Sequence, residues 1–158
     1  MVSRFTEIAI DCHRPRQLAE FWCAVLGYRI IEEQDGVIEI ADWEPSAEAI
    51  RARPVAPTLV FAPVPEAKTV KNRLHIDVSP IDRERDEEVE RLLGLGARRV
   101  DIGQGEQSWV VLADPEGNEF CVLRSLRALG LAEVISLEAT LGCRRNSRRR
   151  FSSVSLSA

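Results

Sequence analysis

The sequence has no long apolar run, no paired cysteines and few histidines. No stretch approaches the roughly 20 apolar residues needed to span a bilayer, and the first residues lack the apolar core of a secretory signal. The four cysteines are scattered without a Cys-x-x-Cys pair, which argues against a zinc knot or a disulfide framework and is typical of reduced intracellular thiols. We therefore expect a cytoplasmic protein that does not associate with membranes. The two histidines, His13 and His75, limit where imidazole chemistry can occur.

Composition and charge divide the chain into a body and a tail. The length of 158 residues fits one domain or two small modules, and a hydrophobic content of 45% can build a core. Residues 1–125 carry 15 Lys+Arg and 23 Asp+Glu, a formal charge of −8, whereas residues 126–158 carry 6 Arg and 2 Glu, a charge of +4. We expect a domain over residues 1–125 and an extension over 126–158 that is partly helical and then basic and disordered. Nucleic-acid binding by the extension is disfavoured because the body is acidic and no aromatic residues interleave the arginines. A tail that contacts a partner protein is a weaker alternative.

The body contains the same βαβββ pattern twice, in modules of about residues 4–66 and 70–124. Alternation of apolar and polar residues predicts the strands and helical spacing predicts one helix per module. Leu26-Gly27 recurs as Leu95-Gly96, 69 positions later. The expected strands are 5–12, 28–33, 37–41, 58–64, 73–78, 97–102, 108–113 and 119–123, with helices over 15–26 and from about 79–82, and a long polar loop over 42–56.

One helix cannot cover both faces of a four-stranded sheet, so neither module can bury its apolar surface alone. Two modules side by side can curve around a shared hollow. We therefore predict an α+β fold in which two paired βαβββ modules form a curved mixed sheet around a cavity for a small molecule.

The segment 73–78 carries the most unusual side chains of the body. As a strand it would place Leu74, Ile76 and Val78 on one face and Arg73, His75 and Asp77 on the other. Charged groups are costly on a core face and acceptable in a wet cavity. An imidazole suits a metal ligand or a general acid or base, although a hydrogen-bonded cavity-wall histidine would fit the same pattern. Glu7 occupies the matching position in the first module, so Glu7 and His75 are our candidate catalytic pair; the alternative for Glu7 is an exposed surface carboxylate.

Several motifs carry a resemblance to a known superfamily. They are Asp11-Cys12-x-x-Pro15, Leu18-Ala19-x-Phe21-Trp22, Leu26-Gly27-Tyr28, Val64-Pro65-Glu66-x-Lys68, 71–77, Leu95-Gly96-Ala97 and 114–122. Over residues 4–124 the chain resembles the vicinal-oxygen-chelate (VOC) superfamily, which includes glyoxalase I, bleomycin-resistance proteins and extradiol dioxygenases, and within it the glyoxalase-like domain branch. The scaffold hosts many reactions, so the resemblance indicates the fold more than the chemistry.

The resemblance implies a metal centre with ligands from the first, fourth, fifth and eighth strands. By position these fall on Glu7, Phe61, His75 and Cys121. Phe61 cannot ligate, and Glu119, on the same strand face as Cys121, is an alternative donor. The alternative for Cys121 is a small core residue, which is the commoner role of a free cysteine. The implied cofactor is a divalent metal (Fe, Mn, Ni, Co or Zn), with no metal as the alternative. The implied assembly is a homodimer.

The remaining candidates are substrate contacts. Lys68 and Arg73 would bind an anionic group at the cavity mouth, unless they belong to a solvated loop, and Trp43, Phe61 and Trp109 would form apolar walls. Two functions follow from the resemblance. One is a metal-dependent lyase, isomerase or dioxygenase, in which the cation acts as a Lewis acid. The other is a metal-free protein that binds or sequesters a small molecule, as resistance proteins do.

Overall fold

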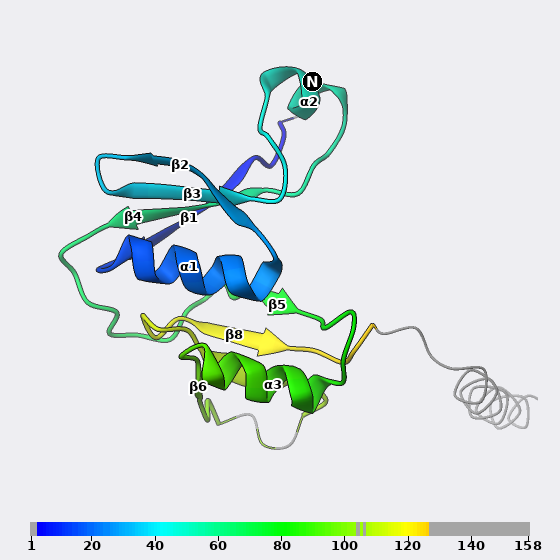
Figure 1. Ribbon diagram of the computed structural model, residues 1–158. Coiled ribbons are helices and arrows are strands. Elements are labelled where there is room, and N and C mark those ends of the chain that lie inside the picture. Colours follow the sequence, from blue (N-terminus) through cyan, green and yellow to red (C-terminus); the bar gives the residue numbers. More distant parts are fainter. Residues whose placement is uncertain (1–2, 104, 106, 127–158) are drawn as a thin grey trace, which may run out of the picture.

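The protein consists of two modules with the same topology (Figure 1). The computed structural model describes residues 3–103, 105 and 107–126, and the predicted extension from 127 onward lies outside these residues. The first module comprises β1 (Glu7–Cys12), α1 (Pro15–Leu26), β2 (Arg29–Gln34), β3 (Val37–Ala41), α2 (Ala47–Ala52) and β4 (Thr58–Pro63). The second comprises β5 (Asp77–Val78), α3 (Arg85–Gly94), β6 (Arg98–Arg99), β7 (Val110–Ala113) and β8 (Glu119–Val122).

Each module forms a four-stranded mixed sheet, and the two strand orders are equivalent. The orders are β1-β4-β3-β2 and β5-β8-β7-β6. In both sheets the first strand is parallel to the last and the other neighbours are antiparallel. The predicted α+β fold and its repeat are confirmed.

Three local predictions were wrong. The strand expected over 73–78 is reduced to β5, and Leu74 is 89% exposed, because ladder pairing with β8 begins only where Ile76 accepts from the N–H of Cys121. The loop expected over 42–56 contains α2, whose first turn is capped by the Ser46 hydroxyl. The second helix was expected to begin at about 79–82, but α3 begins only at Arg85, where Glu84 and Glu87 form a capping box.

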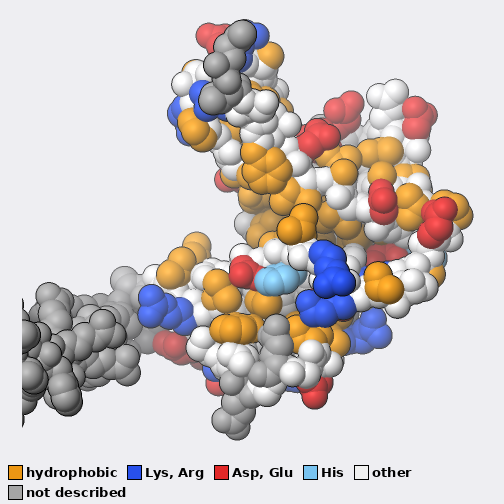
Figure 2. Space-filling model, turned by 180° about the vertical axis from the view of Figure 1, so that it is seen from behind, with side chains coloured by type: hydrophobic (Ala, Val, Ile, Leu, Met, Phe, Trp, Pro, Cys, Tyr) orange, Lys and Arg blue, Asp and Glu red, His pale blue; other side chains and the backbone are white. Residues whose placement is uncertain are grey.

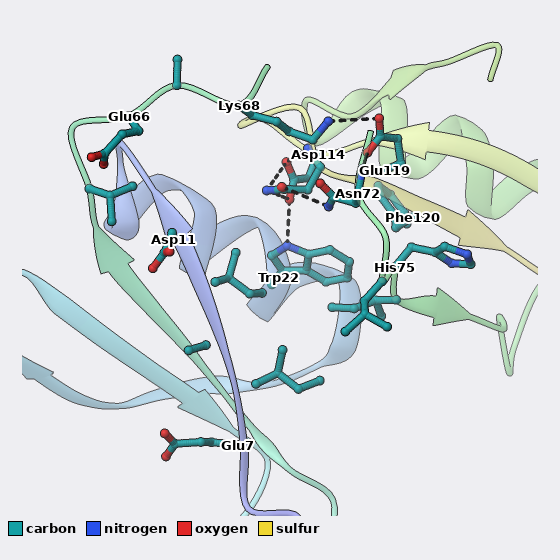
Figure 3. A pocket seen from close by; sticks show the side chains of 18 of the residues that line it. Glu7, Asp11, Trp22, Glu66, Lys68, Asn72, His75, Asp114, Glu119 and Phe120 are labelled. Carbon is teal, nitrogen blue, oxygen red and sulfur yellow. Dashed lines mark hydrogen bonds and ion pairs between the residues drawn. The ribbon is translucent and has the colours of Figure 1, made fainter. Parts of the chain in front are cut away.

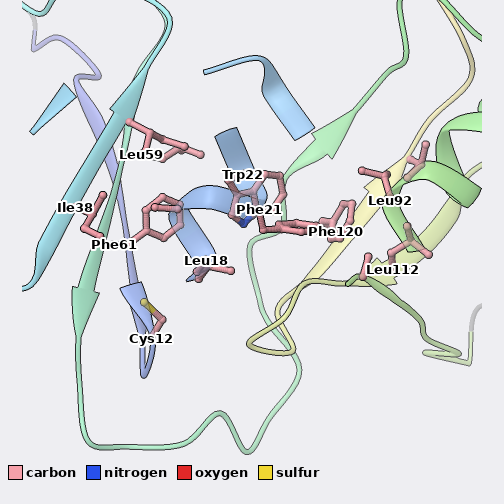
Figure 4. Close-up of a cluster of buried hydrophobic side chains, with 14 of the residues drawn as sticks. Cys12, Leu18, Phe21, Trp22, Ile38, Leu59, Phe61, Leu92, Leu112 and Phe120 are labelled. Atoms are coloured by element: carbon pink, nitrogen blue, oxygen red, sulfur yellow. The ribbon is translucent and has the colours of Figure 1, made fainter. Parts of the chain in front are cut away.

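The core joins the two modules through helix α1. Its stripe of Leu18, Phe21 and Trp22 is buried, and the rings of Phe21 and Trp22 meet Phe120 of β8 edge-on, at centroid distances of 6.1 and 5.2 Å. Figure 4 shows this aromatic group between the side chains of the first sheet and those of the second module. Helix α1 of the first module thus covers part of the sheet of the second module, a surface that the second module could not bury by itself.

No helix among the described residues is long and apolar enough to cross a membrane. The three cysteines in the described part, Cys12, Cys23 and Cys121, are free thiols, as their spacing predicted.

Candidate functional site: a cleft between the modules

A cleft of about 970 Å³ lies between the two modules. Strand β1 borders it on one side, and the segment before β5 and the start of β8 border it on the other; residues 64–72, which link the modules and which we call the strap, supply a further part of its lining. Apolar side chains predominate, and Trp22 and Phe120 form part of the wall. Figure 2 shows this side of the molecule hollowed, with hydrophobic side chains exposed in the hollow.

Asp114 is the most buried polar group of the cleft, at 1% exposure. Its carboxylate accepts hydrogen bonds from the indole N–H of Trp22 (3.3 Å) and from the backbone N–H of Asn118 (2.9 Å) and Glu116 (3.0 Å). Burial raises the pKa of Asp114, although these hydrogen bonds act in the opposite direction. Asp114 therefore shapes the β7–β8 turn and ties it to α1 (Figure 3).

Glu119 fastens the strap to the second sheet. One carboxylate oxygen accepts from Lys68 Nζ at 3.0 Å and the other from the backbone N–H of Asn72 at 3.1 Å, and the side chain is only 11% exposed. Burial alone would raise the pKa of Glu119, but the Asn72 N–H and the Lys68 ammonium outweigh it and lower that pKa. Asn72 also donates to the side-chain oxygen of Asn118 at 3.2 Å. Lys68 is thus neutralised by Glu119 rather than presented to an anionic ligand.

A second, smaller cavity of about 380 Å³ lies on the second sheet. His75, Asp77 and Cys121 line it together with Trp109 and Lys71. His75 Nδ1 lies 2.8 Å from Asp77 Oδ1 and 3.8 Å from Cys121 Sγ. Burial, with Asp77 adding to it, raises the pKa of the Cys121 thiol to about 11, so the thiol is protonated at neutral pH and is a poor nucleophile by itself.

Glu7 and His75 both border the cleft but do not form a pair. Figure 3 shows the Glu7 carboxylate at the far end of β1, pointing away from His75. Within the described residues, the three ligand types that come within 4.8 Å of one another are His75, Asp77 and Cys121. Of the set carried over from the superfamily, His75 and Cys121 converge, whereas Glu7 is remote and Glu119 is held by the strap.

Three of the predicted substrate contacts lie away from both cavities. Phe61 is fully buried and packs in the core on the α1 side of its sheet. Trp43 donates its indole N–H to the carbonyl of Ala56 at 3.2 Å, within the segment around α2. Arg73 lines neither cavity, whereas Trp109 lines the smaller one. Sequence reasoning missed Asn72 and Asn118, because amide side chains in loops give no signal until the strap is placed.

Comparison with known proteins identifies the family. A family model described as Glyoxalase-like domain matches residues 7–123, so the chain belongs to this family, as the resemblance predicted. No curated protein matches the sequence significantly.

The similar solved structures establish the same fold at low sequence identity. A glyoxalase/bleomycin resistance protein/dioxygenase family enzyme from Burkholderia phytofirmans PsJN is 16% identical, with a TM-score of 0.53, covering 76% of this chain and 97% of that one. The fosfomycin resistance protein FosX from Listeria monocytogenes, solved with Mn(II) and sulfate, is 15% identical, with a TM-score of 0.55 and coverages of 79% and 92%. FosX from Mesorhizobium loti is 13% identical, with a TM-score of 0.55 and coverages of 85% and 99%.

Proposed function

We propose that this protein binds a small organic molecule in the cleft between its modules. The observation that carries the proposal is the cleft itself: a hollow of about 970 Å³ with largely apolar walls and a few fixed polar groups. Ligand sites commonly have volumes of about 300–1,000 Å³ and this composition. The polar groups at Asp114, Asn118 and Glu119 are already oriented by hydrogen bonds, so little ordering would oppose binding.

The charge of the cleft favours a neutral or cationic ligand. Glu7, Asp11 and Glu66 line it, and none of their carboxylates forms an ion pair within the described part of the chain. Lys68, the basic residue of its lining, is paired with Glu119. This disfavours the anionic substrate that the basic residues of the sequence led us to expect.

The second candidate is a metal-assisted lyase, isomerase or oxygenase reaction. It is supported by the group of His75, Asp77 and Cys121, because His75 also borders the cleft. A divalent cation there would supply Lewis acidity toward a ligand oxygen.

A homodimer is retained as a proposal, and sedimentation equilibrium of the full chain would test it.

Binding in the cleft can be measured with Trp22 as the reporter. Replacing Trp43 and Trp109 with Phe leaves Trp22 as the single tryptophan of the chain. The neutral dye N-phenyl-1-naphthylamine should bind saturably and accept excitation energy from Trp22. Adding Ala9→Phe, in the cleft wall, should abolish the energy transfer by filling the space.

Ala62→Phe is the matched control. Ala62 lies on β4, one strand from Ala9, opposite Asp11 in the β1–β4 register, and it does not line the cleft. The Ala62→Phe variant should bind the dye as strongly as the protein that keeps only Trp22. If the variant that keeps only Trp22 does not bind the dye, the cleft is not a ligand site. The same conclusion follows if dye binding survives Ala9→Phe unchanged.

A further inference from the structure

The cluster of His75, Asp77 and Cys121 is built by strand register within the second module alone. The parallel pairing of β5 and β8 sets Asp77 opposite Cys121. His75 lies two residues before Asp77, in the segment just ahead of β5, and its Nδ1 lies 2.8 Å from Asp77 Oδ1. One donor atom of each residue lies within 4.8 Å of the others. The group is therefore a product of the backbone arrangement and does not depend on long, mobile side chains.

The distances suit a small four-coordinate cation. In a tetrahedral zinc site, bond lengths of about 2.0–2.3 Å place neighbouring donor atoms about 3.3–3.6 Å apart. The distances from His75 Nδ1, 2.8 Å to Asp77 Oδ1 and 3.8 Å to Cys121 Sγ, fall on either side of this range. Small side-chain rotations could equalise them.

This cluster differs from the ligand set that the superfamily resemblance implies. That set draws on both modules, but the Glu7 carboxylate points away and Glu119 holds Lys68 and Asn72. We propose that the second module alone holds a divalent cation, with His75, Asp77 and the thiolate of Cys121 as its ligands, and that the site selects thiophilic metals such as zinc or cobalt.

The charge balance supports this assignment. Binding would release the thiol proton of Cys121 to solvent, so that one thiolate and the Asp77 carboxylate neutralise the two positive charges of the cation. A thiolate with an imidazole favours zinc-class metals, whereas magnesium and calcium prefer oxygen ligands. The proposal names the metal ligands on which the second candidate function rests, and it stands independently of the organic ligand proposed for the cleft.

Cobalt titration of the full chain tests the site directly. After removal of bound metals with a chelator and dialysis, one equivalent of Co²⁺ should produce the charge-transfer band of a cobalt–thiolate bond. Cys121→Ser should abolish the band, and Cys12→Ser, which alters another buried thiol, should retain it. Asp77→Asn and His75→Gln should each weaken cobalt binding by at least about tenfold. Removing a residue that binds the metal directly should reduce the affinity more than removing one that only hydrogen-bonds to such a residue. Asp77 and His75 are partly exposed, so these two variants should fold.

Glu7→Gln distinguishes this site from one shared between the modules. It should leave cobalt affinity within about twofold, because Glu7 would be no ligand. Zinc should raise the melting temperature of the unmodified protein, and magnesium should not. Zinc should leave the melting temperature of Asp77→Asn unchanged. The proposal is wrong if no thiolate band forms, if the band survives Cys121→Ser, if Asp77→Asn binds cobalt as the parent does, or if Glu7→Gln loses binding.

Discussion

Replacing Phe120 with Ala tests whether helix α1 holds the two modules together. Phe120 is 1% exposed and contacts both Phe21 and Trp22, so its ring belongs to the joint between modules. Truncation of a buried Phe lowers the free energy of unfolding by about 3–5 kcal/mol, of which each lost ring pair accounts for about 0.5–1.5 kcal/mol. Domains of this size have only about 5–15 kcal/mol in total, so the variant should be severely destabilised.

Urea unfolding, followed by circular dichroism and by tryptophan fluorescence, provides the measurement. The parent should unfold in one transition by both probes, since the aromatic group belongs to both modules. Phe120→Leu, which keeps most of the volume but loses the ring contacts, should cost less, about 1.5 kcal/mol. Phe5→Ala, at a site that is 65% exposed, should stay within about 0.5 kcal/mol. If Phe120→Ala were no worse than Phe5→Ala, the joint would lie elsewhere.

Four other substitutions probe turns and charges. Gly27 ends α1 at φ +71, so Gly27→Ala should lower the free energy of unfolding by about 1 kcal/mol. Gly94 is the last residue of α3 and has no close neighbours, so Gly94→Ala should raise the free energy of unfolding, by up to about 1 kcal/mol. Equal effects of the two variants in urea unfolding would contradict this. The pKa of Glu119 is lowered in the fold, so its stabilisation is present above the ordinary glutamate range and lost as pH falls through the folded pKa; the stability difference between the parent and Glu119→Gln should shrink in acid. The pKa of Asp114 is raised, so its contribution is greatest at low pH and declines as pH rises through the folded pKa; the loss in Asp114→Asn should therefore be largest in acid. Unfolding midpoints measured from pH 3 to 7 check both signs, and a common sign for the two variants would refute the assignment.

The repeat could be predicted because each module encodes its elements locally. The stripe of Leu18, Phe21 and Trp22 recurs at helical spacing, and Gly27 adopts the positive φ that its place after the helix demanded. These signals need only neighbours a few residues apart. The prediction of a strand over 73–78 was wrong for the opposite reason. Its apolar alternation indicated a strand, but no strand in the described part of the chain pairs with the backbone at Leu74, and the Leu74 side chain is exposed.

The site could be predicted only in part. His75 and Cys121 were candidates from the sequence, and the β5–β8 register brings them together. Asp77 was visible only as a charged strand residue, and its place beside His75 Nδ1 depends on the backbone just before β5. Glu7 occupied the matching position of the repeat, yet position in a repeat does not fix the direction of a side chain across two separate sheets.

The two βαβββ modules, the buried faces of their helices and the free thiols of the described cysteines could all be predicted from local patterns in the sequence. Each of these follows from the period of apolar residues or from spacing along the chain. Which polar groups meet depends instead on how the chain folds in three dimensions. The tertiary structure closed Lys68 onto Glu119, turned Glu7 away from His75 and buried Phe61 behind its sheet. Such contacts depend on how the strap and the two sheets are placed in three dimensions, and no local pattern records that placement.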